Sequence, residues 1–381
     1  MAKISNKGVL PSAALSRALN IVGRASGKID PSYEMVQVEV KNGKLTVRCF
    51  NGTMGILASI PAEDQGNGFD AIVNAQAFAS LVGSMNGPVT LMPEGRKGLK
   101  VECGSVSVTL SGTTKVLPEF SDPQAKQVLK LSGQDLLELL RVGNSAATDP
   151  MLVLSSVLLD ISSSETSSWA TDSFRAGTCV LPLGGEPTTF LLPVTFVSWM
   201  RTIPTKASVI ISESPNRIVV TAVEDNNTIS MTTPKGEHQK FPALSSIFDS
   251  MFGSSGVLFS IEASTLSQAA RQVKALGGDT IALYTEGNNL CLRAKTDTAG
   301  YKNTLGSING EVNIYLASGF VADGMSLFET PELLFIGTKS PLAVKEGNLR
   351  VLFMPKNVED KISRSEEAEP VTVEQGEAVA V

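Results

Sequence analysis

The sequence has little of the side-chain chemistry that most enzymes use. It contains one histidine, His238, and four cysteines, Cys49, Cys103, Cys179 and Cys291, among 381 residues. A Ser-His-Asp hydrolase or a histidine-ligated metal site would need His238, which lies in the polar segment KGEHQKF and is expected to be a solvated turn residue. The cysteines are far apart, without metal or disulfide spacing. We therefore expect buried free thiols in a reducing compartment.

Other absences narrow the class of protein further. The sequence has no GxxxxGK[ST] loop, no GxGxxG and no CxxC, so we expect no nucleotide, metal or other cofactor. No apolar run approaches the roughly 20 residues of a membrane helix, and the first residues show no signal-peptide pattern. These features favour a cytoplasmic protein without a membrane partner. The net charge of −6 argues against a generally basic nucleic-acid binder, but it allows a local basic surface.

One pattern of elements occurs three times along the chain. An amphipathic helix is followed by strands, a second helix and more strands, in units of about 120 residues, which is the size of a domain. The predicted first helices begin near Ser12, Ser132 and Ser264. The predicted second helices begin near Asn74, Pro193 and Leu316.

The helices carry apolar stripes at helical spacing. In the first helix the stripe is Leu15, Ala18, Leu19 and Val22, and the helix after Ser132 opens with a capping-box pattern. The remaining stripes are Leu136, Leu137 and Leu140; Leu266, Ala270 and Val273; and Phe78, Leu81, Val82 and Met85.

Between the helices, segments such as GKLTVRCF, SVSVTLSG and GNLRVLFMP alternate apolar and polar residues, as half-buried antiparallel strands do. The predicted class is α+β, with two helices packed on antiparallel sheets in each of three tandem domains. Linkers are expected at 117–127 and 241–256. The predicted domains are 1–122, 127–247 and 255–357, followed by an acidic tail at 358–381 that is expected to be disordered.

The segment SSWATDSFRAGTCVLP contains the most unusual polar turn. Thr171, Asp172 and Ser173 separate two strand-like runs, and Arg175 follows directly. On its own this pattern is typical of a β-turn in which Asp172 bonds its own backbone and Arg175 lies on a solvated strand.

Four segments together resemble one known family. WATDSFRAGTCVLP is similar to the Thr-Asp-Gly-His-Arg-Leu-Ala segment of the bacterial DNA polymerase III sliding clamp, the β subunit. KFPALSSIF, VLFMP and LPEFSDP resemble the ends of that family's domains, and their order extends the resemblance over residues 8–356. The resemblance implies a head-to-tail dimeric ring of six such domains around duplex DNA. Such a ring has no catalytic activity; it tethers the replicative polymerase and is opened by an ATP-driven clamp loader.

The resemblance also implies a pocket for short peptide motifs of polymerases and loader subunits. An apolar groove with a few polar groups suits such a peptide, and Arg175 could hold a peptide carbonyl or carboxylate. Phe174 stands where the family usually has histidine, and Ala176 where it has leucine. The implied pocket residues are Leu154, Thr171, Ser173, Phe174, Arg175, Ala176, Pro242, Ile247, Phe320, Pro341, Leu352 and Met354.

In the family the helices line the hole of the ring. Cations on or beside the predicted helices would therefore face DNA in sequence-independent backbone contacts. The implied DNA-facing residues are Arg17, Arg24, Lys28, Arg141, Arg201, Lys206, Arg271 and Lys274. The segment at 148–153 is mostly apolar here, so its DNA contact is expected to be weak or different. The implied dimer contacts are Val108 and Leu110 on an edge strand, with Ala275 and Leu276 at a helix end.

Three other interpretations stay open at the level of the sequence. A tandem-domain virion or surface protein would have the same β-rich pattern but no affinity for polymerase peptides. An enzyme using carboxylates such as Asp149 and Asp172 would need a base or metal set that the sequence does not show. A phage- or plasmid-encoded clamp would fit the altered pocket residues.

Overall fold

The computed structural model describes residues 6–27, 30–114, 117, 124–146, 153–236 and 241–357. The predictions for His238, Lys28, the segment 148–152 and the tail at 358–381 lie outside these residues. By its internal contacts the chain divides into two compact units. Unit 1 is Met1–Leu244 with Gly347–Arg350, and unit 2 is Ser245–Glu346 with Val351–Val381.

Unit 1 holds three sets of antiparallel strands. One has the order β5 (Glu63–Gln65), β1 (Lys7–Pro11), β7 (Pro88–Glu94), β8 (Gly98–Cys103) and β9 (Val106–Leu110). The second has the order β10 (Lys126–Ser132), β15 (Ser208–Glu213), β16 (Arg217–Glu224), β17 (Asn227–Pro234), β4 (Gly55–Pro61), β3 (Lys44–Phe50), β2 (Met35–Lys41) and β6 (Phe69–Asn74). The third has the order β14 (Thr188–Pro193), β11 (Ser156–Ile161), β12 (Thr166–Thr171) and β13 (Arg175–Leu181).

The second of these sets joins the first two predicted repeats into one sheet. Strands β17 and β4 pair antiparallel, with Thr228 opposite Ser59 and Thr232 opposite Gly55. Unit 2 has two further sets of strands. One set is β25 (Leu349–Phe353, whose first two residues count with unit 1), β24 (Leu342–Glu346), β23 (Glu332–Phe335) and β18 (Val257–Ser260). The other is β21 (Gly300–Ser307), β20 (Asn289–Lys295), β19 (Thr280–Glu286) and β22 (Asn313–Ala317).

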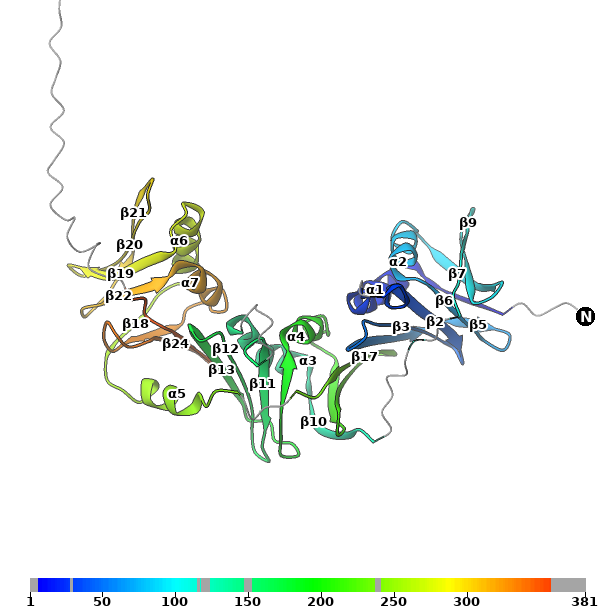
Figure 1. The fold of residues 1–381 in the computed structure, drawn as a ribbon, viewed down its shortest axis with the longest axis horizontal. Coiled ribbons are helices and arrows are strands. Elements are labelled where there is room, and N and C mark those ends of the chain that lie inside the picture. Colours follow the sequence, from blue (N-terminus) through cyan, green and yellow to red (C-terminus); the bar gives the residue numbers. More distant parts are fainter. Residues whose placement is uncertain are drawn as a thin grey trace, which may run out of the picture. The chain divides into compact units, whose positions relative to one another are not determined.

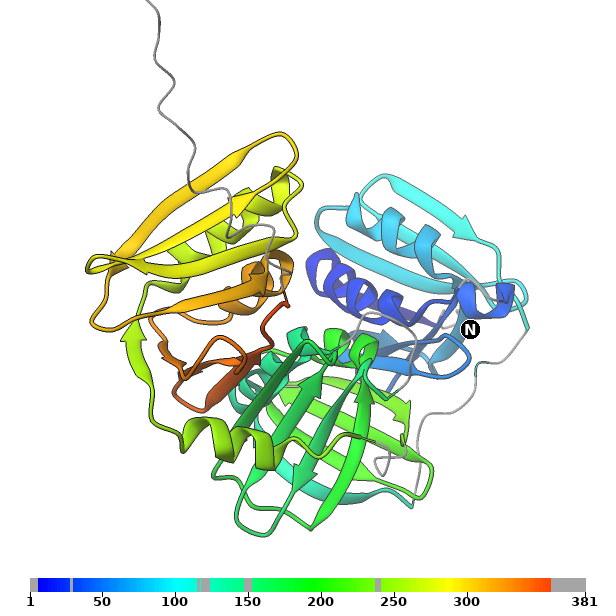
Figure 2. The same ribbon diagram turned by 60° about the vertical axis from the view of Figure 1, so that its left-hand side comes forward.

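The helices occur in pairs, as the repeat predicts. The pairs are α1 (Ser12–Val22) with α2 (Ala75–Gly83), α3 (Gly133–Leu140) with α4 (Val194–Met200), and α6 (Ala263–Ala275) with α7 (Ser318–Met325). Helices α1 and α2 lie side by side, and α1 packs on β3 and β4 (Figures 1 and 2). The other described helical segments are α5 (Ser245–Phe252) and three 3-10 turns, η1 (Gly23–Ala25), η2 (Pro31–Glu34) and η3 (Arg141–Ser145).

The predicted apolar stripes form most of the helix contacts with the core. The stripe of α1 is buried throughout, and so is that of α6. The capping box of α3 is confirmed: the Ser132 hydroxyl accepts from the Asp135 N–H at 3.1 Å, and the Asp135 carboxylate accepts from the Ser132 N–H. Two positions of the predicted stripes are only half-buried, Leu81 and Leu137, and Leu139 is buried on α3 where Leu137 was expected.

The predicted linker at 241–256 contains the division between the two units, at Leu244 and Ser245, but its central residues are helical. Residues Ser245–Phe252 form helix α5, which buries Phe248 and Met251. The helix is short and is flanked by proline and glycine, and these breakers dominated the sequence pattern. All four cysteines are buried free thiols on strands, and in the part of the chain that the structure describes no helix is long and apolar enough to cross a membrane.

Candidate functional site

The Thr-Asp-Ser turn connects β12 to β13 and is held almost entirely by its own side chains. Asp172 Oδ1 accepts from the backbone N–H groups of Phe174 at 3.0 Å and Arg175 at 2.8 Å. The Thr171 hydroxyl donates to the Arg175 carbonyl at 2.7 Å and accepts from the Ser173 N–H at 3.1 Å. Ser173 has φ +75°, in the left-handed region. The turn is therefore a fixed corner, and it places the Phe174 ring in solvent with 61% of the residue exposed.

Arg175 takes part in this corner rather than projecting from it. Its Nε donates to Asp172 Oδ2 at 2.9 Å, and each of the two side chains is only 9% exposed. Removing one member of such a buried pair leaves the other charge buried without a partner, which lowers the free energy of unfolding by about 3–5 kcal/mol. The guanidinium is therefore part of the protein's support for the turn.

The other pocket residues of unit 1 lie near the ends of strands. Thr171 and Ala176 are cross-strand partners at the end of the β12–β13 hairpin, and both are buried. Leu154 lies in the turn before β11 and is half-buried, and Pro242 is exposed in the segment before α5. The structure thus brings five of the predicted residues together in one turn, Thr171, Ser173, Phe174, Arg175 and Ala176.

The pocket residues of unit 2 are more varied in exposure. Ile247 on α5 and Met354, directly after β25, are both exposed apolar side chains. Phe320 on α7 and Pro341 before β24 are half-buried. Leu352 on β25 is 2% exposed, so it belongs to the core of the unit.

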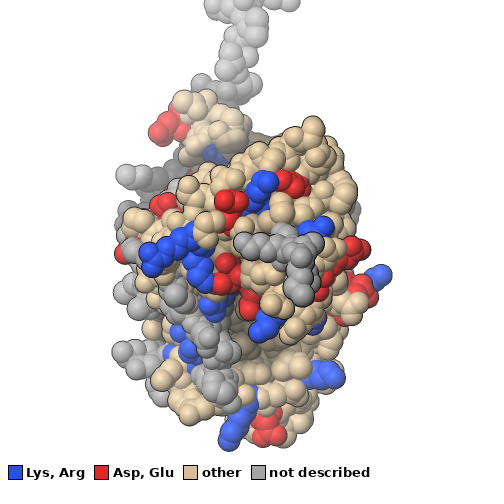
Figure 3. Space-filling view, turned by 90° about the vertical axis from the view of Figure 1, so that its right-hand side faces the viewer, with Lys and Arg blue, Asp and Glu red and all other residues tan. Residues whose placement is uncertain are grey.

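The predicted DNA-facing cations fall into two groups. Five of them lie exposed on or beside the helices, and among the described residues none forms an ion pair. These are Arg17, Arg24, Lys206, Arg271 and Lys274. The face of the molecule shown in Figure 3 carries side chains of both signs of charge. These helix cations can therefore contact phosphates without first breaking an internal pair.

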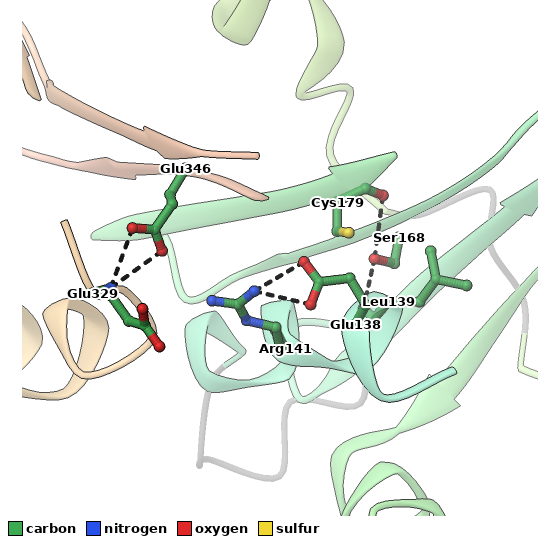
Figure 4. A network of polar contacts seen from close by, with 7 residues as sticks. All are labelled: Glu138, Leu139, Arg141, Ser168, Cys179, Glu329 and Glu346. Carbon is green, nitrogen blue, oxygen red and sulfur yellow. Dashed lines mark hydrogen bonds and ion pairs between the residues drawn. The ribbon is translucent and has the colours of Figure 1, made fainter. Parts of the chain in front are cut away.

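Arg141 and Arg201 differ because the fold already uses them. Arg141 donates to both carboxylate oxygens of Glu138, at 2.8 and 2.9 Å (Figure 4). Arg201 donates to the Leu140 carbonyl at 2.8 Å and to Asn144 Oδ1 at 3.0 Å, so it caps the end of α3. Desolvation lowers the pKa of Arg201 below its usual value. Arg141 and Arg201 therefore stabilise the fold, whether or not they also contact DNA.

The predicted dimer residues lie at a strand edge and a helix end. Strand β9 is the last strand of its sheet, and Val108 and Leu110 are half-buried on it. Its neighbour Val106, which the sequence reasoning missed, is 48% exposed. At the end of α6, Ala275 is exposed and Leu276 is 43% exposed. An unpaired edge with exposed apolar residues is a surface that another chain can cover.

Sequence reasoning also missed a groove beside α1, with a volume of about 550 Å³. Small side chains such as Ala58 and Ala222 form part of its lining, and Arg17 and Glu224 are polar groups in it. No local pattern could have revealed the groove, because it combines α1 with β4, β16, β17 and the segment after α4. In the described part of the chain, no three His, Cys, Asp or Glu residues are grouped to hold a metal ion.

Solved structures of bacterial sliding clamps have the same fold along nearly the whole chain. The β subunit of DNA polymerase III from Thermotoga maritima matches with a TM-score of 0.81 at 16% identity, over 93% of this chain and 100% of its own. The Pseudomonas aeruginosa clamp bound to griselimycin matches with a TM-score of 0.80 at 16% identity, over 93% and 100% of the two chains. The Helicobacter pylori β clamp bound to a DNA ligase peptide gives 0.79 at 15% identity, over 92% and 100%.

No protein-family model matches the chain, and no curated protein matches it by sequence. The fold is nevertheless well defined. It is the α+β fold of tandem clamp domains, as the sequence predicted, and more particularly that of DNA polymerase III β subunits.

Proposed function

We propose that this protein is a DNA sliding clamp. Two chains would assemble head to tail into a ring around duplex DNA and would tether the replicative polymerase without catalysing a reaction. The observation that carries the proposal is the fold, which is similar to bacterial clamps over 93% of this chain and 100% of theirs. The proposed three domains are 1–122, 127–247 and 255–357, and the protein would act in the cytoplasm.

The exposed helix cations support sequence-independent contact with duplex DNA. The net charge of the chain is −6, but four cations lie exposed on or beside its helices: Arg17, Arg24, Arg271 and Lys274. These cations form a local positive surface that suits phosphates. Such contacts depend on charge and carry no sequence information, which suits a protein that moves along DNA.

The edge strand β9 and the end of α6 support a closed ring. We propose that they contact each other across the subunit boundary, because each exposes apolar side chains, Val106 and Leu276. A head-to-tail contact at this place would also cover the exposed edge of the sheet at β9.

The β12–β13 turn supports peptide binding. We propose that this turn, together with Leu154, Pro242, Ile247, Phe320, Pro341, Leu352 and Met354, takes short peptides of the polymerase and the clamp loader. A related clamp, that of Helicobacter pylori, was solved with a DNA ligase peptide.

Processive DNA synthesis tests this function. A primed single-stranded circle is extended by the polymerase and clamp loader of the source cell, with and without this protein, and product lengths are measured. The proposal predicts much longer products with the protein, and loss of the effect with Leu276→Asp. Val223→Asp is the matched control, since Val223 is an exposed apolar residue on β16, away from the proposed contact. Equal product lengths with and without the protein would contradict the proposal.

A further inference from the structure

The sheet of β19, β20, β21 and β22 in unit 2 has two different faces. Helix α6 packs on β19 and β21 and α7 packs on β22, and both helices lie on the same side of these strands (Figure 1). Successive side chains of a strand point to opposite faces. Ile281 and Leu283 on β19 are fully buried and belong to the face that the helices cover. Tyr284, the next residue, therefore belongs to the opposite face.

This opposite face carries a hollow of about 770 Å³, a volume typical of ligand sites. Cross-strand pairing brings its central side chains together. Ala282 on β19 lies opposite Arg293 on β20 and opposite Tyr315 on β22. Arg293 in turn lies opposite Lys302 on β21. The hollow thus collects aromatic and basic side chains from all four strands.

Two tyrosines of this face line the hollow, Tyr284 and Tyr315, and both are half-buried. The guanidinium carbon of Arg293 lies 4.8 Å from the centre of the Tyr284 ring. Cation–π attraction holds an arginine in this position, and its planar group can itself stack on a flat ligand. Together these side chains offer a flat aromatic ligand more than one surface on which to stack.

The lining of the hollow is positive although the chain as a whole is acidic. Each of its two carboxylates already holds a lysine. The pairs are Glu286 with Lys302, at 2.8 Å, and Asp279 with Lys356, at 2.7 Å. The lining has two further cations, Arg293 and Lys295, and Lys295 is exposed. These two charges exceed the acidic groups and complement a phosphate.

We infer that this hollow binds single-stranded DNA, with phosphates at Arg293 and Lys295 and unpaired bases stacked against the tyrosines. Aromatic side chains beside cations bind single strands in this way without reading their sequence. The bases of a duplex are stacked inside it and cannot reach Tyr284 and Tyr315. An acidic peptide would leave both rings without a stacking partner.

The inference goes beyond the proposed function, which concerns duplex DNA and peptides. Only the choice of DNA as the strand rests on that function. The hollow lies on the face of its sheet away from α6, so its cations differ from the helix cations proposed to contact the duplex.

Fluorescence anisotropy of a labelled oligothymidylate of about 12 nucleotides tests the inference, with the full-length protein titrated at several salt concentrations. Tyr315→Ala should weaken binding about 5- to 100-fold through the loss of stacking. Tyr315→Phe keeps the ring and should retain most of the affinity. Lys295→Ala should reduce the slope of log affinity against log salt by about 0.7, the value for one phosphate contact on a single strand.

Lys44→Ala is the matched control for Lys295→Ala. It removes the same charge from an exposed position on β3 in unit 1 and should leave the slope unchanged. An abasic oligonucleotide of the same length and an oligoglutamate of the same charge should both compete weakly, because neither has bases to stack.

Equal binding by wild type, Tyr315→Ala and Lys295→Ala would overturn the inference, and so would an oligoglutamate that competes as well as oligothymidylate. Synthesis on a primed circle separates this from failure of the proposed function. Long products, with oligothymidylate binding that depends on neither Tyr315 nor Lys295, would refute the inference alone. Absence of long products would refute the clamp function, whereas binding that depends on both residues would still support the hollow as a single-strand site.

Discussion

The carboxylate of Asp172 and the guanidinium of Arg175, three residues apart, form a buried ion pair inside the turn that they both belong to. One carboxylate oxygen holds the backbone of the turn, and the other holds the arginine side chain. Because both side chains are buried, their charges stabilise the turn and are not accessible to a binding partner. The exposed group at this corner is apolar, and this relationship leads to the first two predictions.

Arg175→Ala should lower the free energy of unfolding by about 3–5 kcal/mol, because it leaves the Asp172 carboxylate buried without its cation. Chemical denaturation followed by circular dichroism measures this. Lys302→Ala is the control: it removes a member of the exposed Lys302–Glu286 pair and should leave stability unchanged. The double variant Asp172→Asn with Arg175→Met should recover most of the loss, since Asn51 holds the same turn without a charge. A fully stable Arg175→Ala would show that the pair contributes nothing.

Ser173→Gly should raise the free energy of unfolding by about 1 kcal/mol, because Ser173 has φ +75° and a Cβ is unfavourable in the left-handed region. Thermal unfolding compares it with Ser163→Gly. Ser163 holds the same position in the β11–β12 turn but does not have a positive φ. There glycine should destabilise by about 0.5–1 kcal/mol through the entropy of the unfolded chain. Equal effects of the two substitutions would contradict the conformational explanation.

The buried thiols predict how stability depends on alkaline pH. Burial raises the pKa of Cys49 to about 12, and burial with the nearby Glu138 raises the pKa of Cys179 to about 12, from 9.0. Because the folded protein holds these protons more tightly, their stabilisation is complete below pH 9 and is lost as the pH rises toward 12. The slope is about 1.4 kcal/mol per pH unit for each thiol.

The free energy of unfolding measured from pH 8 to 11 checks this prediction. The double variant Cys49→Ala and Cys179→Ala serves as the control and should show a shallower decline than wild type. Parallel curves for the two proteins would show that the thiols do not cause the pH dependence.

The exposed helix cations predict the salt dependence of DNA binding. Arg17→Ala and Arg24→Ala should each reduce the slope of log affinity against log salt by about 0.9, the value for one phosphate contact. Arg141→Ala should change the slope less, since Glu138 already neutralises that arginine. Titrations on a fixed duplex at several salt concentrations measure the slopes. A larger change of slope for Arg141→Ala than for Arg17→Ala would contradict the proposal that the exposed helix cations, rather than the internally bonded arginines, make the main phosphate contacts.

Features that depend on neighbours along the chain could be predicted from the sequence. The stripe of α1 and the capping box of α3 are local patterns, and the structure confirms them. Helix α5 was not predicted because it is short and lies between Pro242 and Gly253, and these residues indicate a loop. Its two buried residues, Phe248 and Met251, are too few to show a clear helical period. The burial of Arg175 could have been inferred from Asp172, three residues before it, because the two form an ion pair. The sequence pattern was instead interpreted as an ordinary β-turn with a solvated arginine.

Features that depend on distant residues could not be predicted. Arg201 bonds the Leu140 carbonyl 61 residues away, so its use as a cap appears only in the fold. Val106 alternates like its neighbours on β9, and its exposure follows from the position of β9 at the edge of the sheet.

Retention on circular DNA tests the central claim most directly. The protein is loaded with a clamp loader onto nicked circular duplex, separated from free protein by gel filtration in high salt, and followed after the circle is cut by a restriction enzyme. The account predicts that the protein stays on the circle and is released when the DNA becomes linear, because a closed ring is held by topology. Equal retention on circular and linear DNA, or none on either, would contradict it.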